Sequence, residues 1–110
     1  MSTTVQETQL TMDMILKMTP EVFRDIMKVQ TLGYKKSLIN LLKAQYEQCS
    51  MVKESLVAVL NKVDTIPDDE KIQCETALKD LYMCMQLIED RHTILDLLVK
   101  EEETKVLLRH

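Results

Sequence analysis

Residues that interrupt helices or favour strands are scarce in this sequence. Its 110 residues include one Gly, two Pro, no Trp and one Phe. Strands are enriched in aromatic and β-branched residues, whereas the abundant Leu, Met, Lys, Glu and Gln lose little side-chain freedom in a helix. The composition therefore predicts an all-α fold. A chain of this length builds one modest core, so we expect a single helical domain over residues 1–110.

Long apolar runs and metal-binding motifs are also missing. No stretch approaches the roughly 18 uncharged apolar residues of a membrane span, and the first residues lack the basic and apolar regions of a secretory leader. Three cysteines, Cys49, Cys74 and Cys84, have no CxxC spacing, and an odd number of Cys on apolar faces is typical of a reducing compartment. We expect a cytoplasmic or nuclear protein with no membrane segment, metal ion or cofactor.

Charge of each sign is distributed unevenly. Residues 1–63 hold eight Lys or Arg against six Asp or Glu, and residues 64–110 hold six against twelve. The opposite net charges of the two parts favour their packing on each other. The total of −4 disfavours a nucleic-acid-binding surface.

Three helix-interrupting residues, Pro20, Gly33 and Pro67, divide the chain into four segments. Thr19 is expected to cap the second helix, with Pro20 at its first position. Gly33 is expected to end that helix in the left-handed conformation. The expected helices cover residues 5–18, 20–32, 34–63 and 68–108.

Two ladders of mostly apolar residues, stepping by four and three, run along the third and fourth helices. The first ladder consists of Leu38, Leu42, Gln45, Cys49, Val52, Leu56, Val59 and Val63. The second consists of Cys74, Leu78, Leu81, Met85, Ile88, His92, Leu95 and Val99. Such spacing is typical of coiled coils. The fold class that we predict is a long antiparallel, coiled-coil-like hairpin with two shorter N-terminal helices, a helical bundle completed by oligomerisation.

One antiparallel register satisfies both ladders, the one in which the numbers of facing residues add to 137. A shift by seven residues leaves too short a reversal in one direction and a long loop in the other. The preferred register sets Lys35 opposite Glu102, which we expect to form a weak surface ion pair. It also sets Gln45 opposite His92, and a polar layer of this kind helps to specify one alignment.

Apolar residues outside the ladders need a further partner. The two short helices are expected to cover part of the hairpin, but one flank of the fourth helix remains apolar. The expected contact residues on this flank are Met83, Leu87, Ile94 and Leu97. A second expected contact face consists of Phe23, Ile26 and Met27. We therefore predict a non-enzymatic adaptor or assembly subunit that binds protein, either as a homodimer or through partner helices.

Methionine is more frequent than usual, with eight residues in the chain. Four of them precede the long helices: Met12, Met14, Met18 and Met27. Flexible thioether side chains suit either an adaptable binding groove or an irregular core. The core is the favoured interpretation.

Two other functions are kept as alternatives. A small regulator of nucleic-acid transactions would use a helix-turn-helix around Gly33 and contact phosphates with Arg24, Lys28, Lys35 and Lys36. An enzyme would need a site formed between subunits around His92. This second alternative is weaker, because the sequence offers no nucleophile or orienting group beside His92, and its expected neighbour is Gln45.

Overall fold

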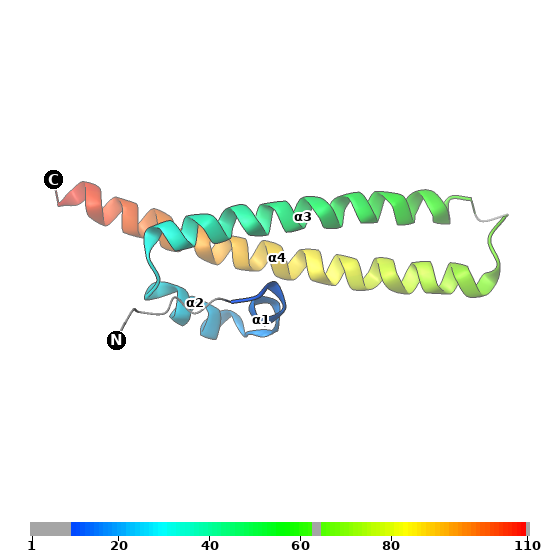
Figure 1. The fold of residues 1–110 in the computed structure, drawn as a ribbon, viewed down its shortest axis with the longest axis horizontal. Coiled ribbons are helices and arrows are strands. Elements are labelled where there is room, and N and C mark those ends of the chain that lie inside the picture. Colours follow the sequence, from blue (N-terminus) through cyan, green and yellow to red (C-terminus); the bar gives the residue numbers. More distant parts are fainter. Residues whose placement is uncertain (1–9, 63–64, 110) are drawn as a thin grey trace, which may run out of the picture.

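The computed structural model describes residues 10–62 and 65–109, and four helices account for most of them (Figure 1). No strand occurs in this part of the chain, so the all-α expectation is confirmed. The start of the first expected helix, residues 5–9, lies outside the described residues, as does Val63 at the end of the third. The helices are α1 (Met12–Lys17), α2 (Pro20–Lys28), α3 (Leu32–Leu60) and α4 (Asp68–Leu108).

Threonine starts each of the first three helices. Thr11, Thr19 and Thr31 accept hydrogen bonds from the backbone N–H three residues later, at 3.1 to 3.2 Å. These bonds satisfy N–H groups that have no partner within the helix. Pro20 occupies the first position of α2, as expected, because its missing N–H is not needed there. The break between α1 and α2 therefore follows directly from the sequence.

Gly33 does not end α2, contrary to the expectation. α2 ends at Lys28, and Gly33 is the second residue of α3. No residue of the described part has a positive φ, so the left-handed C-cap is absent there. Thr31 caps α3 before the glycine is reached. A threonine N-cap and a glycine C-cap compete at this boundary, and the N-cap prevails.

α3 and α4 form the expected antiparallel hairpin (Figure 1). α1 and α2 fold back and pack against α4 along the part of the hairpin that is remote from the turn. We call this part the proximal half (residues 32–49 and 85–108). The part toward the turn is the distal half (residues 50–60 and 68–84).

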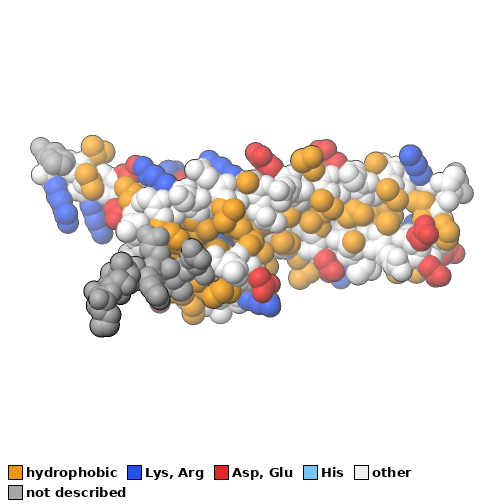
Figure 2. All heavy atoms as spheres, viewed as in Figure 1, with side chains coloured by type: hydrophobic (Ala, Val, Ile, Leu, Met, Phe, Trp, Pro, Cys, Tyr) orange, Lys and Arg blue, Asp and Glu red, His pale blue; other side chains and the backbone are white. Residues whose placement is uncertain are grey.

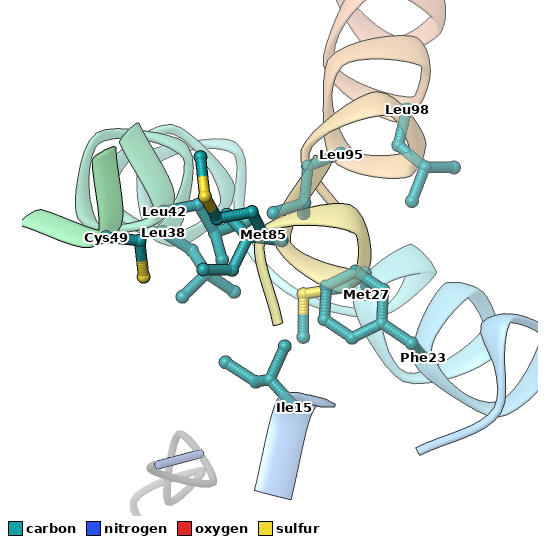
Figure 3. Close-up of a cluster of buried hydrophobic side chains, with 10 residues drawn as sticks. Ile15, Phe23, Met27, Leu38, Leu42, Cys49, Met85, Leu95 and Leu98 are labelled. Atoms are coloured by element: carbon teal, nitrogen blue, oxygen red, sulfur yellow. The ribbon is translucent and has the colours of Figure 1, made fainter. Parts of the chain in front are cut away.

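The core lies where α1 and α2 meet the hairpin (Figure 3). Ile15 of α1 and Phe23 of α2 are fully buried there. Met27 is also fully buried, and Met12 and Met18 pack against the same cluster, whereas Met14 is exposed. Three of these four methionines therefore belong to the core, as the favoured interpretation predicts.

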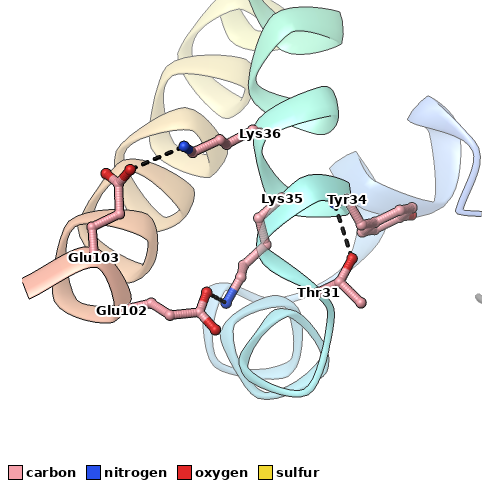
Figure 4. A network of polar contacts seen from close by, with 6 residues as sticks. All are labelled: Thr31, Tyr34, Lys35, Lys36, Glu102 and Glu103. Carbon is pink, nitrogen blue, oxygen red and sulfur yellow. Dashed lines mark hydrogen bonds and ion pairs between the residues drawn. The ribbon is translucent and has the colours of Figure 1, made fainter. Parts of the chain in front are cut away.

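The register is confirmed at the end of the hairpin that is remote from the turn (Figure 4). Lys35 Nζ lies 3.1 Å from Glu102 Oε2, the pair that the 137 alignment predicts. The expectation of a surface pair is wrong for the lysine, whose side chain is only 4% exposed. α2 connects to α3 next to this point, which removes Lys35 from water. The neighbouring pair, Lys36 with Glu103 at 2.9 Å, remains at the surface.

The two ion pairs should respond differently to loss of the carboxylate charge. Glu102→Gln leaves the buried Lys35 without a counter-ion, and we expect a loss of about 1–2 kcal/mol in the free energy of unfolding. The loss is limited because the Glu102 side chain is 40% exposed and water screens the pair. Glu103→Gln is the matched control, with an expected effect below about 0.5 kcal/mol. Urea unfolding measures both, and equal losses would contradict the buried role of Lys35.

Candidate interaction surface

The two ladders are buried along only half of the hairpin. All the apolar ladder residues of the proximal half are buried. In the distal half, Val52 and Val59 are 50% and 42% exposed, although both belong to the first ladder. Their neighbours Leu56, Leu78 and Leu81 are half-buried. We call these five residues the distal seam.

The geometry of a helix explains part of this opening. A helix with 3.6 residues per turn turns a seven-residue repeat by about 20° per heptad, unless it supercoils. Over the three heptads from Leu38 to Val59, this drift amounts to about 60°. Val59 thereby turns outward, and Val57 and Leu60 are half-buried instead.

The rest of the exposure of Val52 and Val59 arises because no third helix of the described residues covers the distal half. Leu38 borders a groove with Leu10 and Thr11, so its side of α3 faces the segment that leads into α1. Val52 and Val59 continue the same seven-residue stripe into the distal half, beyond the region that the N-terminal helices cover. Figure 2 shows hydrophobic side chains along the junction of the two long helices toward the turn. A two-helix seam leaves such residues open on one side, and another helix is needed to bury them.

The expected contact residues on the flank of α4 fall into two groups. Met83 and Leu97 are exposed. Leu87 and Ile94 are half-buried, and Ile94 packs against the core. The structure therefore leaves Met83 and Leu97 free for a contact, while Ile94 contributes to the fold.

The second expected contact face is not available to a partner, contrary to the expectation. Phe23 and Met27 are fully buried within the chain, and Ile26 is half-buried against the same cluster. Their apolar stripe on α2 is used to attach α2 to α4. A partner would reach them only after displacing α2.

A buried arginine attaches the N-terminal helices to the hairpin, and the sequence analysis missed its role. Arg91 of α4 donates through Nε to the backbone oxygen of Ile15 at 3.3 Å and through Nη2 to that of Met18. The guanidinium also lies over the Phe23 ring, 5.8 Å from its centroid. The last carbonyls of a helix lack partners within it and carry partial negative charge. Arg91 therefore holds the end of α1 in place.

The signal for this contact was present in the sequence. Arg91 lies seven residues from both Cys84 and Leu98, on an apolar stripe of α4 that is separate from the ladder. A charged residue within such a stripe requires buried hydrogen-bond acceptors. Pro20, which cannot donate to the carbonyl of Leu16, interrupts the chain between α1 and α2, and a helix end supplies such acceptors.

The proposed polar layer forms no hydrogen bond within the described residues. Gln45 and His92 are both half-buried, and His92 Nε2 is buried with no hydrogen-bond partner among residues 10–62 and 65–109. His92 instead lines a shallow groove of about 400 Å³, together with Tyr46 and Glu89. The Tyr46 hydroxyl donates to Glu89 Oε1 at 2.8 Å, and this bond, together with some burial and the charge of Glu89, raises the pKa of Tyr46.

The same groove contains the hydroxyl of Thr93, which donates to the backbone oxygen of Glu89 at 3.0 Å. A nucleophile must be paired with a base that activates it. His92 Nε2 makes no such contact in the described structure. The groove therefore offers polar contacts to a ligand and no assembled nucleophile and base.

The basic residues of the helix-turn-helix alternative are partly occupied. Lys35 and Lys36 are paired with Glu102 and Glu103. Gly33 lies inside α3, and the turn occupies residues 29–31. The other two cations of this alternative, Arg24 and Lys28, are exposed. Neither has an ion pair within the described part of the chain.

No helix among residues 10–62 and 65–109 combines the length and apolar character needed to cross a membrane. Nor do three His, Cys, Asp or Glu side chains of these residues gather as metal ligands would. No protein-family model, curated protein sequence or solved structure matches the chain.

Proposed function

We propose that this chain is a non-enzymatic interaction or assembly subunit that buries its distal seam against a helical partner. The observation that carries the proposal is the contrast in burial along a single pair of ladders. Residues that repeat with the same spacing are buried beside α1 and α2 and half-exposed beyond them. Exposed apolar stripes of this kind are typical of helix-binding surfaces.

A second copy of the chain is the partner that we test first. The distal half of one hairpin supplies two helices with an unfilled seam, and two such halves, placed face to face, complete a four-helix bundle. The same patch would be used by both copies, as in most homodimers. Met83 lies on α4 within the same half and would extend the contact at its edge.

Charge placed in the distal seam should abolish this association. Val52→Glu together with Val59→Glu would bury two carboxylates without partners, and we expect the dissociation constant to rise by at least about 100-fold. The α3 and α4 helices should persist, since both valines are half-exposed. Size-exclusion chromatography with light scattering measures the association, and circular dichroism checks the helix content.

A matched control lies one residue earlier along α3. Met51 and Ala58 are also exposed and seven residues apart, but they lie on the side of α3 away from the seam. Met51→Glu with Ala58→Glu should therefore leave association unchanged. A parent chain that remains monomeric at millimolar concentration would contradict the second copy as partner, and an equal loss in both double variants would contradict the distal seam as the contact.

A further inference from the structure

A pocket of about 390 Å³ lies at the end of the hairpin that is remote from the turn. Its lining combines the end of α2, the beginning of α3 and the last turns of α4. Two of the lining residues are carboxylates, Glu101 and Glu102. Four are cations: Lys28, Lys35, Lys105 and Arg109. The pocket therefore carries a net charge of +2 (four minus two) in a chain whose total is −4.

Three of the four cations have no counter-ion within residues 10–62 and 65–109. Lys35 is the exception, since its buried ammonium is paired with Glu102 (Figure 4). Lys28, Lys105 and Arg109 are exposed and form no ion pair in the described part of the chain. Figure 2 shows Lys and Arg side chains at the C-terminal end of α4. Their charges are available to an anion from outside the chain.

The position of these cations at helix ends does not account for the pocket. Lys28 is the last residue of α2, and Lys105 lies in the last turn of α4. A cation there is favourable, because the last carbonyls of a helix carry partial negative charge. That effect concerns each helix separately and does not require the cations of two helices to line one pocket. Cations that converge on one pocket attract an anionic ligand.

Apolar side chains lie next to the same cations. Leu98 and Val106 line the pocket, and Val106 is exposed. Val29, which follows Lys28, is 82% exposed, and Leu107 is exposed as well. An inorganic anion would leave these side chains in water. A protein segment that carries both carboxylates and apolar side chains would cover them.

The cations of α4 fit an acidic helix better than they fit a nucleic acid. Lys105 and Arg109 are four residues apart, which places their Cβ atoms about 6 Å from each other. Carboxylates four residues apart on a partner helix have the same spacing. A nucleic acid presents a continuous row of phosphates. Glu101 and Glu102 in the pocket, and the negative total of the chain, would repel such a row.

We propose that this pocket binds an acidic helical segment of a partner protein. The carboxylates of the segment pair with Lys28, Lys105 and Arg109, and its apolar side chains cover Val106. This inference goes beyond the proposed function and does not depend on it, because the pocket and the distal seam lie at opposite ends of the hairpin.

Fluorescence anisotropy with a labelled peptide tests the proposal. The peptide is a helix of repeated Glu-Ala-Leu-Glu, and it is titrated with the full chain. We expect saturable binding that weakens as salt is raised, because the paired charges lie at the surface. The triple variant Lys28→Gln, Lys105→Gln and Arg109→Gln should weaken binding at least about 10-fold.

Two further variants separate the pocket from the overall charge. Lys62, Lys71 and Lys79 lie near the turn and form no ion pair in the described part of the chain. Their triple replacement by Gln removes the same charge and should change binding by less than about 2-fold. Glu101→Gln should tighten binding about 2- to 3-fold, because it removes a carboxylate from the pocket. Damage to the fold would not tighten binding. Circular dichroism checks that helix content is unchanged.

Several results would overturn the proposal. One is a parent chain that does not bind the Glu-Ala-Leu-Glu peptide at low salt. Another is an equal loss in the two triple variants, which would indicate attraction by the overall charge. Equally tight binding of a Glu-Ala-Ala-Glu peptide or of single-stranded DNA would show that apolar side chains of the ligand have no role. Val52→Glu with Val59→Glu should retain peptide binding, and its loss would contradict a site separate from the distal seam.

Discussion

Replacing Arg91 by methionine is expected to lower the free energy of unfolding by about 2–3 kcal/mol and to loosen α1 and α2 from the hairpin. Methionine fills much of the same volume but donates no hydrogen bond. The carbonyls of Ile15 and Met18 would then be left without their present donor, and each unsatisfied buried acceptor costs about 1–3 kcal/mol. The contact with the Phe23 ring is lost too.

The sign of this effect follows from what remains after the substitution. Among the described residues Arg91 has no carboxylate partner, and its Nη1 has no hydrogen-bond partner. Removal of such a buried charge is itself favourable. The two carbonyls nevertheless stay in place, because they belong to the backbone at the end of α1. We therefore expect a net loss that is smaller than the sum of two orphaned acceptors and the ring contact.

Urea unfolding gives the total change, and hydrogen exchange locates it. Exchange should accelerate in residues 12–28 and change little in the distal half of α3. Arg24→Met is the matched control, since Arg24 is exposed on α2, and it should change stability by no more than about 0.5 kcal/mol. If Arg91→Met left both stability and exchange unchanged, the role of Arg91 in holding α1 would be disproved.

Truncation of Leu42 to alanine should have an effect at least as large. Leu42 is fully buried in the first ladder and belongs to the core cluster, so its removal loses buried apolar surface and leaves a cavity. Comparable changes cost about 2–5 kcal/mol. Leu42 has no exposed surface, so the contacts that the truncation removes are contacts with protein atoms.

The adjacent Leu41 gives a closely matched comparison. It is the same residue type on the same helix, but it is 49% exposed. Leu41→Ala should cost less than about 1 kcal/mol, because a partly exposed side chain leaves no enclosed cavity. Both values come from urea unfolding at one temperature. Similar losses at the two positions would show that the ladder does not decide which face of α3 is buried.

The hairpin was predictable because the residue spacings that specify it are local and are repeated along both long helices. The extent of α4, 68–108, agrees with the expectation at both ends. The Thr19 and Pro20 start of α2 was also predicted, since capping involves only residues three positions apart. Gly33 was misassigned because two local signals conflict there, and the residues around it do not show which one prevails.

The candidate surface was predicted only in part. The sequence shows which residues are apolar, and Met83 and Leu97 are exposed as expected. It does not show that Phe23 and Met27 are buried in the attachment of α2. Nor did the ladders predict the exposure of Val52 and Val59. A strict seven-residue repeat predicts a supercoil in which every heptad faces the partner helix.

The sequence by itself determined four features: the helical class, the turn near Pro67, the antiparallel pairing of the long helices and the register that brings Lys35 to Glu102. These depend on spacings of three, four and seven residues, which the chain repeats many times. Tertiary structure alone decided which half of the hairpin is covered. That choice depends on Arg91 meeting the end of α1 more than 70 residues away. The spacing of α4 indicates that Arg91 needs buried acceptors, but no local spacing shows which carbonyls supply them. The two ladders are therefore one pattern with two outcomes, a closed core in one half and an open seam in the other.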